Sequence, residues 1–451
     1  MKDLTKGSPA KVILQFALPV LIGQLLQLCY SLADTRIVST LLGEQALSAV
    51  GATSALSALL VSLLTNLANG FAIIVARYFG ANDEDMVKRT VAWTFGCSIL
   101  LALAISTGTV LGMPLILHGL HTPDEIYSQA RQYISIVFGG AVISILYNSS
   151  AAVLRAIGDT VTPVLFLLLS VILNIAGDFF CIQVLHLGVA GAAIATVAAQ
   201  LIAMVACVTY MWKRYELLRI GWADFRKPGK IVQMLLGCGL SMGLMGCIVN
   251  IGSVCLQMGI NSLGQDIIVA HTAARKISEI FMLMFGVLGS TMATYSSQNY
   301  GAGCYERIRT GLKQVLLIGW CWCALVLLLS YTLSPALVRM VTGTVNAVVL
   351  ENASYYLKVD TLFYVIPVAI AILRNTLQGI GDHTTPIVSS GIECVGKVLI
   401  VFLLVPPLGY FGIILAEPIV WIIMVIPLII QIVRNPVMRH LSDSDAVSYH
   451  E

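Results

Sequence analysis

The chain has 451 residues, of which 58% are hydrophobic and 11% are charged, and its formal net charge is +3. A soluble domain has about 45–50% apolar and about 25% charged residues. The composition therefore excludes a soluble enzyme, a nucleic-acid binder and a disordered scaffold. A mean hydropathy of +0.89 predicts a protein that crosses a membrane many times.

Twelve apolar runs are long enough to cross a bilayer, which takes roughly 20 residues of α-helix. In the first half they cover 12–37, 47–75, 90–117, 127–153, 162–185 and 189–211, and in the second half 231–260, 267–297, 312–333, 348–376, 385–405 and 411–433. The first run is too long for a signal-peptide core and lacks a small-residue cleavage site. We therefore expect an all-α polytopic membrane protein with twelve transmembrane helices.

Lysine and arginine are distributed unevenly over the predicted loops. With the N-terminus inside, most of the 26 basic residues lie on the inner side. The outer side then holds Arg36, Arg131, Arg339 and Lys358. Cytoplasmic loops carry such an excess of positive charge. The pattern predicts a multi-pass protein of the cytoplasmic (inner) membrane with both termini in the cytoplasm.

The two halves of the chain repeat the same motifs in the same order. The segment LRAIGDTVTP at 154–163 matches LQGIGDHTTP at 377–386, and Leu42-Gly43 matches Leu263-Gly264. In the repeated turn we expect the aspartate to cap the next helix and the proline to begin it. The repeats predict two six-helix bundles that are pseudo-symmetric.

The longest polar and basic stretch separates the two repeats and predicts the domain borders. We expect an N-terminal bundle at 1–215, a cytoplasmic linker at 216–229, a C-terminal bundle at 230–440 and a cytoplasmic tail at 441–451. Parallel repeats in transporters enclose a central cleft, and one half rocks against the other. The organisation therefore favours transport by alternating access.

Ionisable side chains inside a membrane span cost about 2.5–3.5 kcal/mol on insertion scales and usually mark function. Asp34 lies late in the first span, and Asp178 lies in the fifth, one turn after Asn174. Neither aspartate has a basic residue four positions away, so burial would favour the protonated carboxyl and allow proton exchange. The alternative for Asp34 is a solvated position at the outer interface, influenced by Arg36.

Charges in the second half are expected to have a structural role. Arg275 with Glu279, and Glu393 with Lys397, are opposite charges four residues apart, a spacing that predicts ion pairs within one helix. Glu417, directly before Pro418, has no such partner on its own helix. In the first half, Pro19 lies in the middle of the first span and predicts a kink.

These motifs together resemble the multidrug and toxic compound extrusion (MATE) family of transporters, in its prokaryotic form. The resemblance rests on YSLADTRIVSTLLGEQALSAVG, RYFGAND, LRAIGDTVTP, SQNYGAG and LQGIGDHTTP. It implies an antiporter, not an enzyme, that exports amphipathic organic cations in exchange for H⁺ or Na⁺. Membrane lipid and small organic cations are the expected partners, with no nucleic acid, no cofactor, no metal and a monomeric state.

The resemblance also implies roles for particular residues. Asp34, Asp178 and Asn174 stand where the family couples transport to H⁺ or Na⁺, and Pro19 matches its bending proline. The surrounding polar network in the substrate cleft would comprise Gln27, Tyr133, Asn148 and Thr196. Arg36 departs from the family pattern. In one subgroup acidic residues of spans seven and ten bind the cation, but the matching stretches GCIVNIGSV and LFYVIPVAI lack them, which disfavours Na⁺ binding in the C-terminal bundle.

Two other functions remain as alternatives. A flippase for lipid-linked saccharides, from the related superfamily, would line its cleft with arginines that hold pyrophosphate, whereas few basic residues fall within the predicted spans. A membrane-embedded enzyme would need a catalytic cluster, but most of the seven histidines lie in predicted loops or tails. The efflux antiporter is the leading interpretation.

Overall fold

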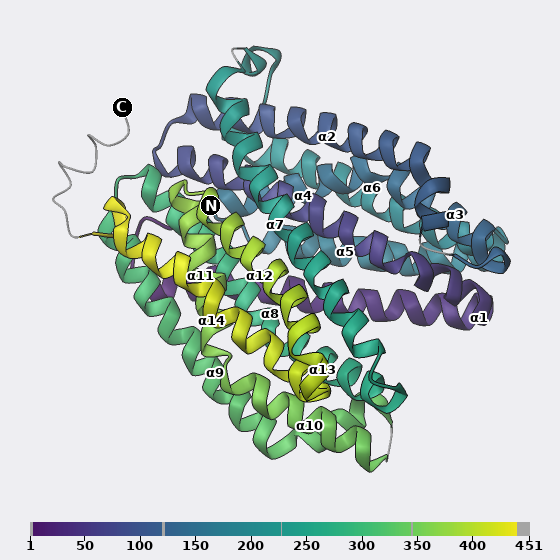
Figure 1. Ribbon diagram of the computed structural model, residues 1–451. Helices are drawn as coiled ribbons and strands as arrows, with labels where there is room; N and C mark the ends of the chain where they lie inside the picture. Colours follow the sequence, from purple (N-terminus) through teal and green to yellow (C-terminus); the bar gives the residue numbers. More distant parts are fainter. Residues whose placement is uncertain (1–2, 120–121, 227, 344–345, 440–451) are drawn as a thin grey trace. The chain divides into compact units, whose positions relative to one another are not determined.

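The computed structural model describes residues 3–119, 122–226, 228–343 and 346–439, which are helical without any strand (Figure 1). The first helices are α1 (Pro9–Gly80), α2 (Glu84–Gly119), α3 (Asp124–Gly139), α4 (Ala141–Ala156), α5 (Val161–Phe179) and α6 (Gly188–Arg214). A π-helical turn, Phe180–Val184, follows α5, and two 3₁₀ turns, Glu216–Leu218 and Trp222–Phe225, follow α6.

The second half of the chain continues in the same way. Its helices are α7 (Gly229–Asn261), α8 (Gln265–Gly301), α9 (Tyr305–Thr342), α10 (Ala347–Leu362), α11 (Val365–Ile380), α12 (Thr384–Leu403), α13 (Val405–Leu408) and α14 (Tyr410–Arg434). A 3₁₀ turn at Pro436–Met438 ends the described chain. The predicted tail at 441–451 lies outside the described residues.

Within the described residues, 10 helical segments are long and apolar enough to cross a membrane. Two of them, Pro9–Gly43 and Gln45–Gly80, are the two parts of α1. The pairs α3–α4 and α10–α11 each form one further span, bent by 44° and 53°, which gives up to 12 spans. The all-α polytopic fold predicted from the apolar runs is confirmed.

The internal repeat is visible in the backbone as well as in the sequence. Gly43 has φ 81° and Gly264 has φ 94°, a region that residues with a side chain rarely adopt. Each glycine therefore lets the chain turn sharply between the first and second span of its half. The bent α3–α4 and α10–α11 pairs likewise occupy the same place in each half.

The repeated aspartates act as predicted in the turns that precede α5 and α12. Asp159 Oδ1 accepts a hydrogen bond from the backbone N–H of Thr162 at 3.1 Å. Asp382 Oδ1 accepts from the backbone N–H groups of Thr384 and Thr385, both at 3.0 Å. These bonds satisfy donors that a helix start leaves without a partner, so the turn motif is structural.

The chain falls into two compact units. Unit 1 is formed mainly by Leu18–Gly243, and unit 2 by Leu4–Ala17 and the described residues from Leu244 onward. The border therefore lies inside α7, and not at the predicted linker 216–229. The reason is close packing of α7 on α1: a Cβ atom on Gly70 would lie 2.6 Å from Gly239 Cα, so the two backbones touch.

The N-terminal segment joins unit 2 through backbone contacts. Gln298 Oε1 accepts a hydrogen bond from the Leu4 N–H at 3.0 Å, and the Arg307 guanidinium donates to the Gly7 carbonyl at 2.8 Å. Sequence periodicity carries no signal for such contacts, because they join residues far apart in the chain. The predicted central cleft between the bundles stays a prediction.

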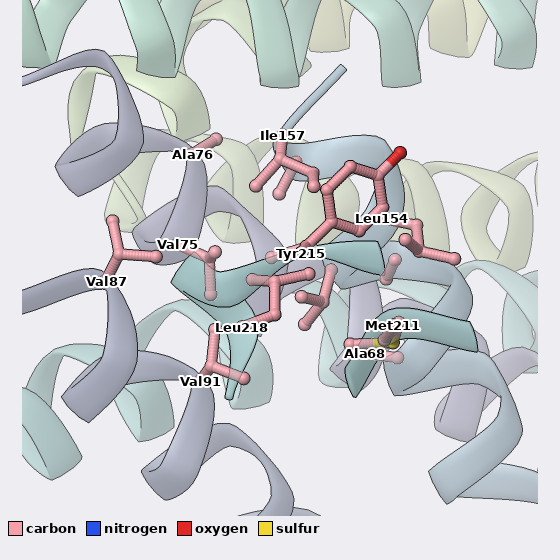
Figure 2. Close-up of a cluster of buried hydrophobic side chains, with 14 of the residues drawn as sticks. Ala68, Val75, Ala76, Val87, Val91, Leu154, Ile157, Met211, Tyr215 and Leu218 are labelled. Atoms are coloured by element: carbon pink, nitrogen blue, oxygen red, sulfur yellow. The ribbon is translucent and has the colours of Figure 1, made fainter. Parts of the chain in front are cut away.

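One end of unit 1 has an apolar core that holds the start of the linker (Figure 2). Its side chains come from α1, α2, α4, α6 and the linker: Ala68, Val75, Ala76, Val87, Val91, Leu154, Ile157, Met211, Tyr215 and Leu218. The Tyr215 hydroxyl donates to Asp159 Oδ2 at 2.7 Å. Burial and the neighbouring carboxylate raise the pKa of Tyr215, which keeps the phenol protonated as a donor. The linker is thereby fixed to the turn before α5.

Candidate functional site

Two carboxyl groups of unit 1 lie next to each other. Asp34 is on the first part of α1, and Asp178, fully buried, is in the last turn of α5. Their side chains lie close enough to interact with each other. A carboxylate has only acceptors, so a bond between two carboxyl groups requires a proton on one of them. Two neighbouring carboxyl groups of this kind have the chemistry to share one proton.

Asn174 and Thr196 hold Asp178 in place. With the Asn174 amide oriented to satisfy both of its polar atoms, its nitrogen donates to Asp178 Oδ2 at 3.2 Å. Its oxygen then accepts from the Thr196 hydroxyl at 3.1 Å. Thr196 lies on α6, so the amide ties α5 to α6 at the carboxyl pair. The i, i+4 spacing of Asn174 and Asp178 placed them on one helix face, as predicted.

Each aspartate has one buried oxygen that lacks a hydrogen-bond partner in the described part of the chain. Asp34 Oδ1 and Asp178 Oδ1 are buried and have no hydrogen-bond partner among the described residues. Buried polar atoms are nearly always paired, so such exceptions call for an explanation. Within the same residues no ion pair joins Asp34 to Arg36, whose side chain is exposed. A proton shared between the two carboxyl groups, or a bound cation, would satisfy these oxygens.

Of the other residues expected at this site, some lie near the carboxyl pair and some do not. Tyr133 of α3 interacts electrostatically with both carboxyl groups. Asn148 of α4 donates instead to the Ser144 carbonyl at 2.8 Å and accepts from Thr65 at 3.5 Å. Gln27 is exposed, and α1 continues through Pro19. The structure thus brings Tyr133 to the carboxyl pair and Asn148 into a second polar group.

Tyr30 was not anticipated from the sequence. Its side chain lies close to Thr196 and close enough to both aspartates to interact with them electrostatically. Tyr30 precedes Asp34 by four residues, so the two side chains share one face of α1. The same spacing that identified Asn174 could therefore have identified Tyr30.

Unit 2 contains buried ion pairs, of which one was predicted wrongly. Arg275 Nη1 contacts Glu417 Oε2 at 2.8 Å, whereas Glu279 pairs with Lys276 at 3.1 Å on an exposed face. The predicted Arg275–Glu279 pair therefore does not form, because Arg275 faces another helix. The predicted Glu393–Lys397 pair is confirmed, with Nζ and Oε1 3.0 Å apart.

A buried acid of α10 was also missed. Asp360 is fully buried, and its Oδ2 accepts hydrogen bonds from Ser278 at 3.2 Å and Tyr364 at 3.0 Å. The stretch LFYVIPVAI of the tenth span has no acidic residue, but it begins two residues after Asp360. Excluding acids from the tenth span on that stretch was therefore wrong, since α10 begins earlier and its core face includes Asp360.

Known proteins share the sequence pattern and the fold. Residues 19–180 and 242–403 each match the sequence profile of the MatE family. The chain is 28% identical over 309 residues, 68% of either protein, to a probable multidrug resistance protein, YpnP, of Bacillus subtilis strain 168. It is 21% identical over 354 residues, 78% of either protein, to the multidrug export protein MepA of Staphylococcus saprophyticus.

A solved structure has the same fold. It is the outward-facing conformation of a multidrug resistance MATE family transporter of the MOP superfamily, with a TM-score of 0.90 and 22% sequence identity. The alignment covers 97% of this chain and 98% of that one. The family profile, in turn, matches once in each half and includes both Asp34 and Asp178. This protein is therefore a membrane-spanning transporter, not an enzyme, and belongs to the MatE family.

Proposed function

We propose that this protein is a secondary antiporter that exports amphipathic organic cations across the cytoplasmic membrane in exchange for H⁺. The observation that carries the proposal is the neighbouring pair Asp34 and Asp178, with one buried oxygen on each carboxyl group that has no hydrogen-bond partner among the described residues. The names of the relatives YpnP and MepA, a multidrug resistance and a multidrug export protein, support small-molecule export. The protein would act as a monomer with both termini in the cytoplasm.

The two carboxyl groups would serve the proton and the drug in turn. Ionised, they attract a cation, because little water is present to screen the charge. Protonation from the outer side removes that charge, so the cation leaves as the protons bind. After the protein reopens to the cytoplasm, lower acidity removes the protons and restores the site. Competition for the same oxygens is sufficient to couple proton import to drug export.

Neighbouring residues would set the geometry of this exchange. The amide of Asn174 holds Asp178 Oδ2, which leaves Oδ1 to the ligand. Tyr30 and Tyr133 lie near the pair, and aromatic rings attract organic cations. Pro19 deprives α1 of one backbone hydrogen bond, so the helix that carries Asp34 could bend when Asp34 becomes neutral.

Proton release on adding drug to detergent-solubilised protein tests the proposal. We expect wild type to release protons, and Asp34→Asn and Asp178→Asn to release fewer while remaining folded. Asp124→Asn, the same change at an exposed position in the first turn of α3, is the matched control and should behave as wild type. Unchanged release from both site variants would refute the assignment.

Proteoliposomes with separately imposed gradients distinguish H⁺ from Na⁺. Uptake of a fluorescent cation should follow a proton gradient in the absence of Na⁺. Transport that needs Na⁺ and ignores the proton gradient would assign the same carboxyl groups to sodium.

The flippase alternative is disfavoured by charge pairing in unit 2. Arg275 pairs with Glu417, and both Arg374 and Lys397 pair with Glu393. No base of this group is left unpaired for a pyrophosphate.

A further inference from the structure

Five charges, four of them buried, form a chain of alternating sign through unit 2. Arg275 of α8 contacts Glu417 of α14 at 2.8 Å, and Glu417 contacts Lys397 of α12 at 3.7 Å. Lys397 contacts Glu393 at 3.0 Å, and Glu393 contacts Arg374 of α11 at 3.8 Å. The Arg275 side chain is 28% exposed, and the other four are at most 10% exposed. Four helices are thereby joined by charge.

A sixth charge balances the chain. Three bases and two glutamates leave one positive charge in excess. Asp360 of α10 lies close enough to interact electrostatically with Arg275 and Glu417. When Asp360 is ionised, the group of six is neutral, and each of its carboxylates has a cation that belongs to the protein.

We propose that Arg275 is a tethered cation that occupies the place beside Glu417 and Asp360 and so excludes a mobile coupling ion from unit 2. Arg275 thereby determines which unit performs coupling and confines it to Asp34 and Asp178. This inference rests on the proposed antiport function. Na⁺ binding to unit 2 can nevertheless be tested separately from antiport.

The oxygens around Arg275 are of the kind that a hard cation needs. Glu417 and Asp360 carry carboxylates, and Ser278 and Tyr364 place hydroxyls on Asp360. Sites for hard cations are built from such oxygen ligands. A guanidinium remains charged at every accessible pH, so it cannot vacate the place by losing a proton. A second buried cation beside it would be unpaired and strongly disfavoured.

Arg275 differs from the other two bases of the chain in this respect. Arg374 lies at the far end, where Glu393 also has Lys397 at 3.0 Å. Lys397 is shared between two glutamates and held by the Ser253 hydroxyl at 3.4 Å. Removal of Arg275 alone therefore deprives Asp360 of the cation with which it interacts, and it leaves Glu417 with only the more distant Lys397.

The test uses full-length protein in detergent at alkaline pH, with Asp34→Asn and Asp178→Asn introduced to silence unit 1. Na⁺-dependent thermal stabilisation is compared with choline at equal ionic strength, and ²²Na⁺ binding is measured directly. We expect no saturable Na⁺ effect in this background. Adding Arg275→Met should create one, in which Na⁺ at ten times its Kd favours the folded state about elevenfold. A further Glu417→Gln change should abolish it.

Two controls separate this role from a structural one. Arg374→Met in the same background removes a guanidinium that is even less exposed than that of Arg275, yet should create no Na⁺ response. Guanidinium ion at low millimolar concentration should compete with Na⁺ in Arg275→Met, because it can bind beside Glu417 where the Arg275 side chain was.

Two results would overturn the inference. One is a folded Arg275→Met protein without any Na⁺ response. The other is a saturable Na⁺ response already present in the background protein and removed by Glu417→Gln. The second measurement needs no change at Arg275, so it decides the matter even if Arg275→Met fails to fold. Both results are independent of drug-dependent proton release, on which the antiport proposal depends.

Discussion

Lys397 is the central charge of unit 2, and its removal should be severely destabilising. The ammonium is 3% exposed and lies 3.0 Å from Glu393 and 3.7 Å from Glu417. Lys397→Met leaves Glu393 with only the more distant Arg374, at 3.8 Å, while Glu417 keeps Arg275 at 2.8 Å but loses its second cation. Removing one partner of a buried ion pair costs about 3–5 kcal/mol. We expect a loss within this range.

A double change should recover part of that loss. In Glu393→Gln/Lys397→Met, Glu417 keeps Arg275, and Arg374 keeps its hydrogen bond to Ser389 Oγ at 3.2 Å. One positive and one negative charge are removed together, so the group stays neutral. Contacting residues typically show interaction energies of about 0.5–3 kcal/mol, and the double variant should be more stable than Lys397→Met by an amount near the upper end.

The assay is reversible unfolding in mixed micelles by titration with sodium dodecyl sulfate, followed by circular dichroism. Lys276→Met is the matched control, since Lys276 also pairs with a glutamate, Glu279, at 3.1 Å, but with 62% and 52% of the two side chains exposed. Exposed pairs contribute about 0–1 kcal/mol. The reasoning is refuted if Lys397→Met costs no more than Lys276→Met, or if the double variant is no more stable than Lys397→Met. A double variant that folds well but cannot transport would assign the pair a functional role.

Three further outcomes follow from unit 1. Gly43→Ala should lose about 1–3 kcal/mol, because φ is 81° there; Gly237→Ala, with no atom near its Cβ position, should show no such loss of thermal stability. Tyr215→Phe should lower the melting temperature. It removes the 2.7 Å hydrogen bond to Asp159, and leaving the carboxylate oxygen unpaired costs about 1–3 kcal/mol. A cysteine at the exposed Ala223 should resist a membrane-impermeant reagent in intact cells; labelling from outside would reverse the proposed topology.

Local sequence patterns were sufficient to predict the spans, the repeats and the part of the site that lies on α5. Helix formation depends on residues within one or two turns of each other, so apolar runs and glycine turns identified the helices. The same short range explains Asn174 and Asp178, and also Glu393 and Lys397, because residues four apart on a helix are neighbours. The caps formed by Asp159 and Asp382 are equally local.

Tertiary packing decided every contact that joins one helix to another. Arg275 has an acid four residues away on its own helix, yet it pairs with Glu417 on α14, 142 residues further on. Asp360 of α10 accepts a hydrogen bond from Ser278 of α8, and Tyr30 of α1 lies close to Thr196 of α6. Which face of a helix is buried against which neighbour depends on the whole packed unit. The sequence by itself therefore determined where charge enters the membrane, and only the tertiary structure decided which charges neutralise one another, because a buried charge is stable only with a partner in contact.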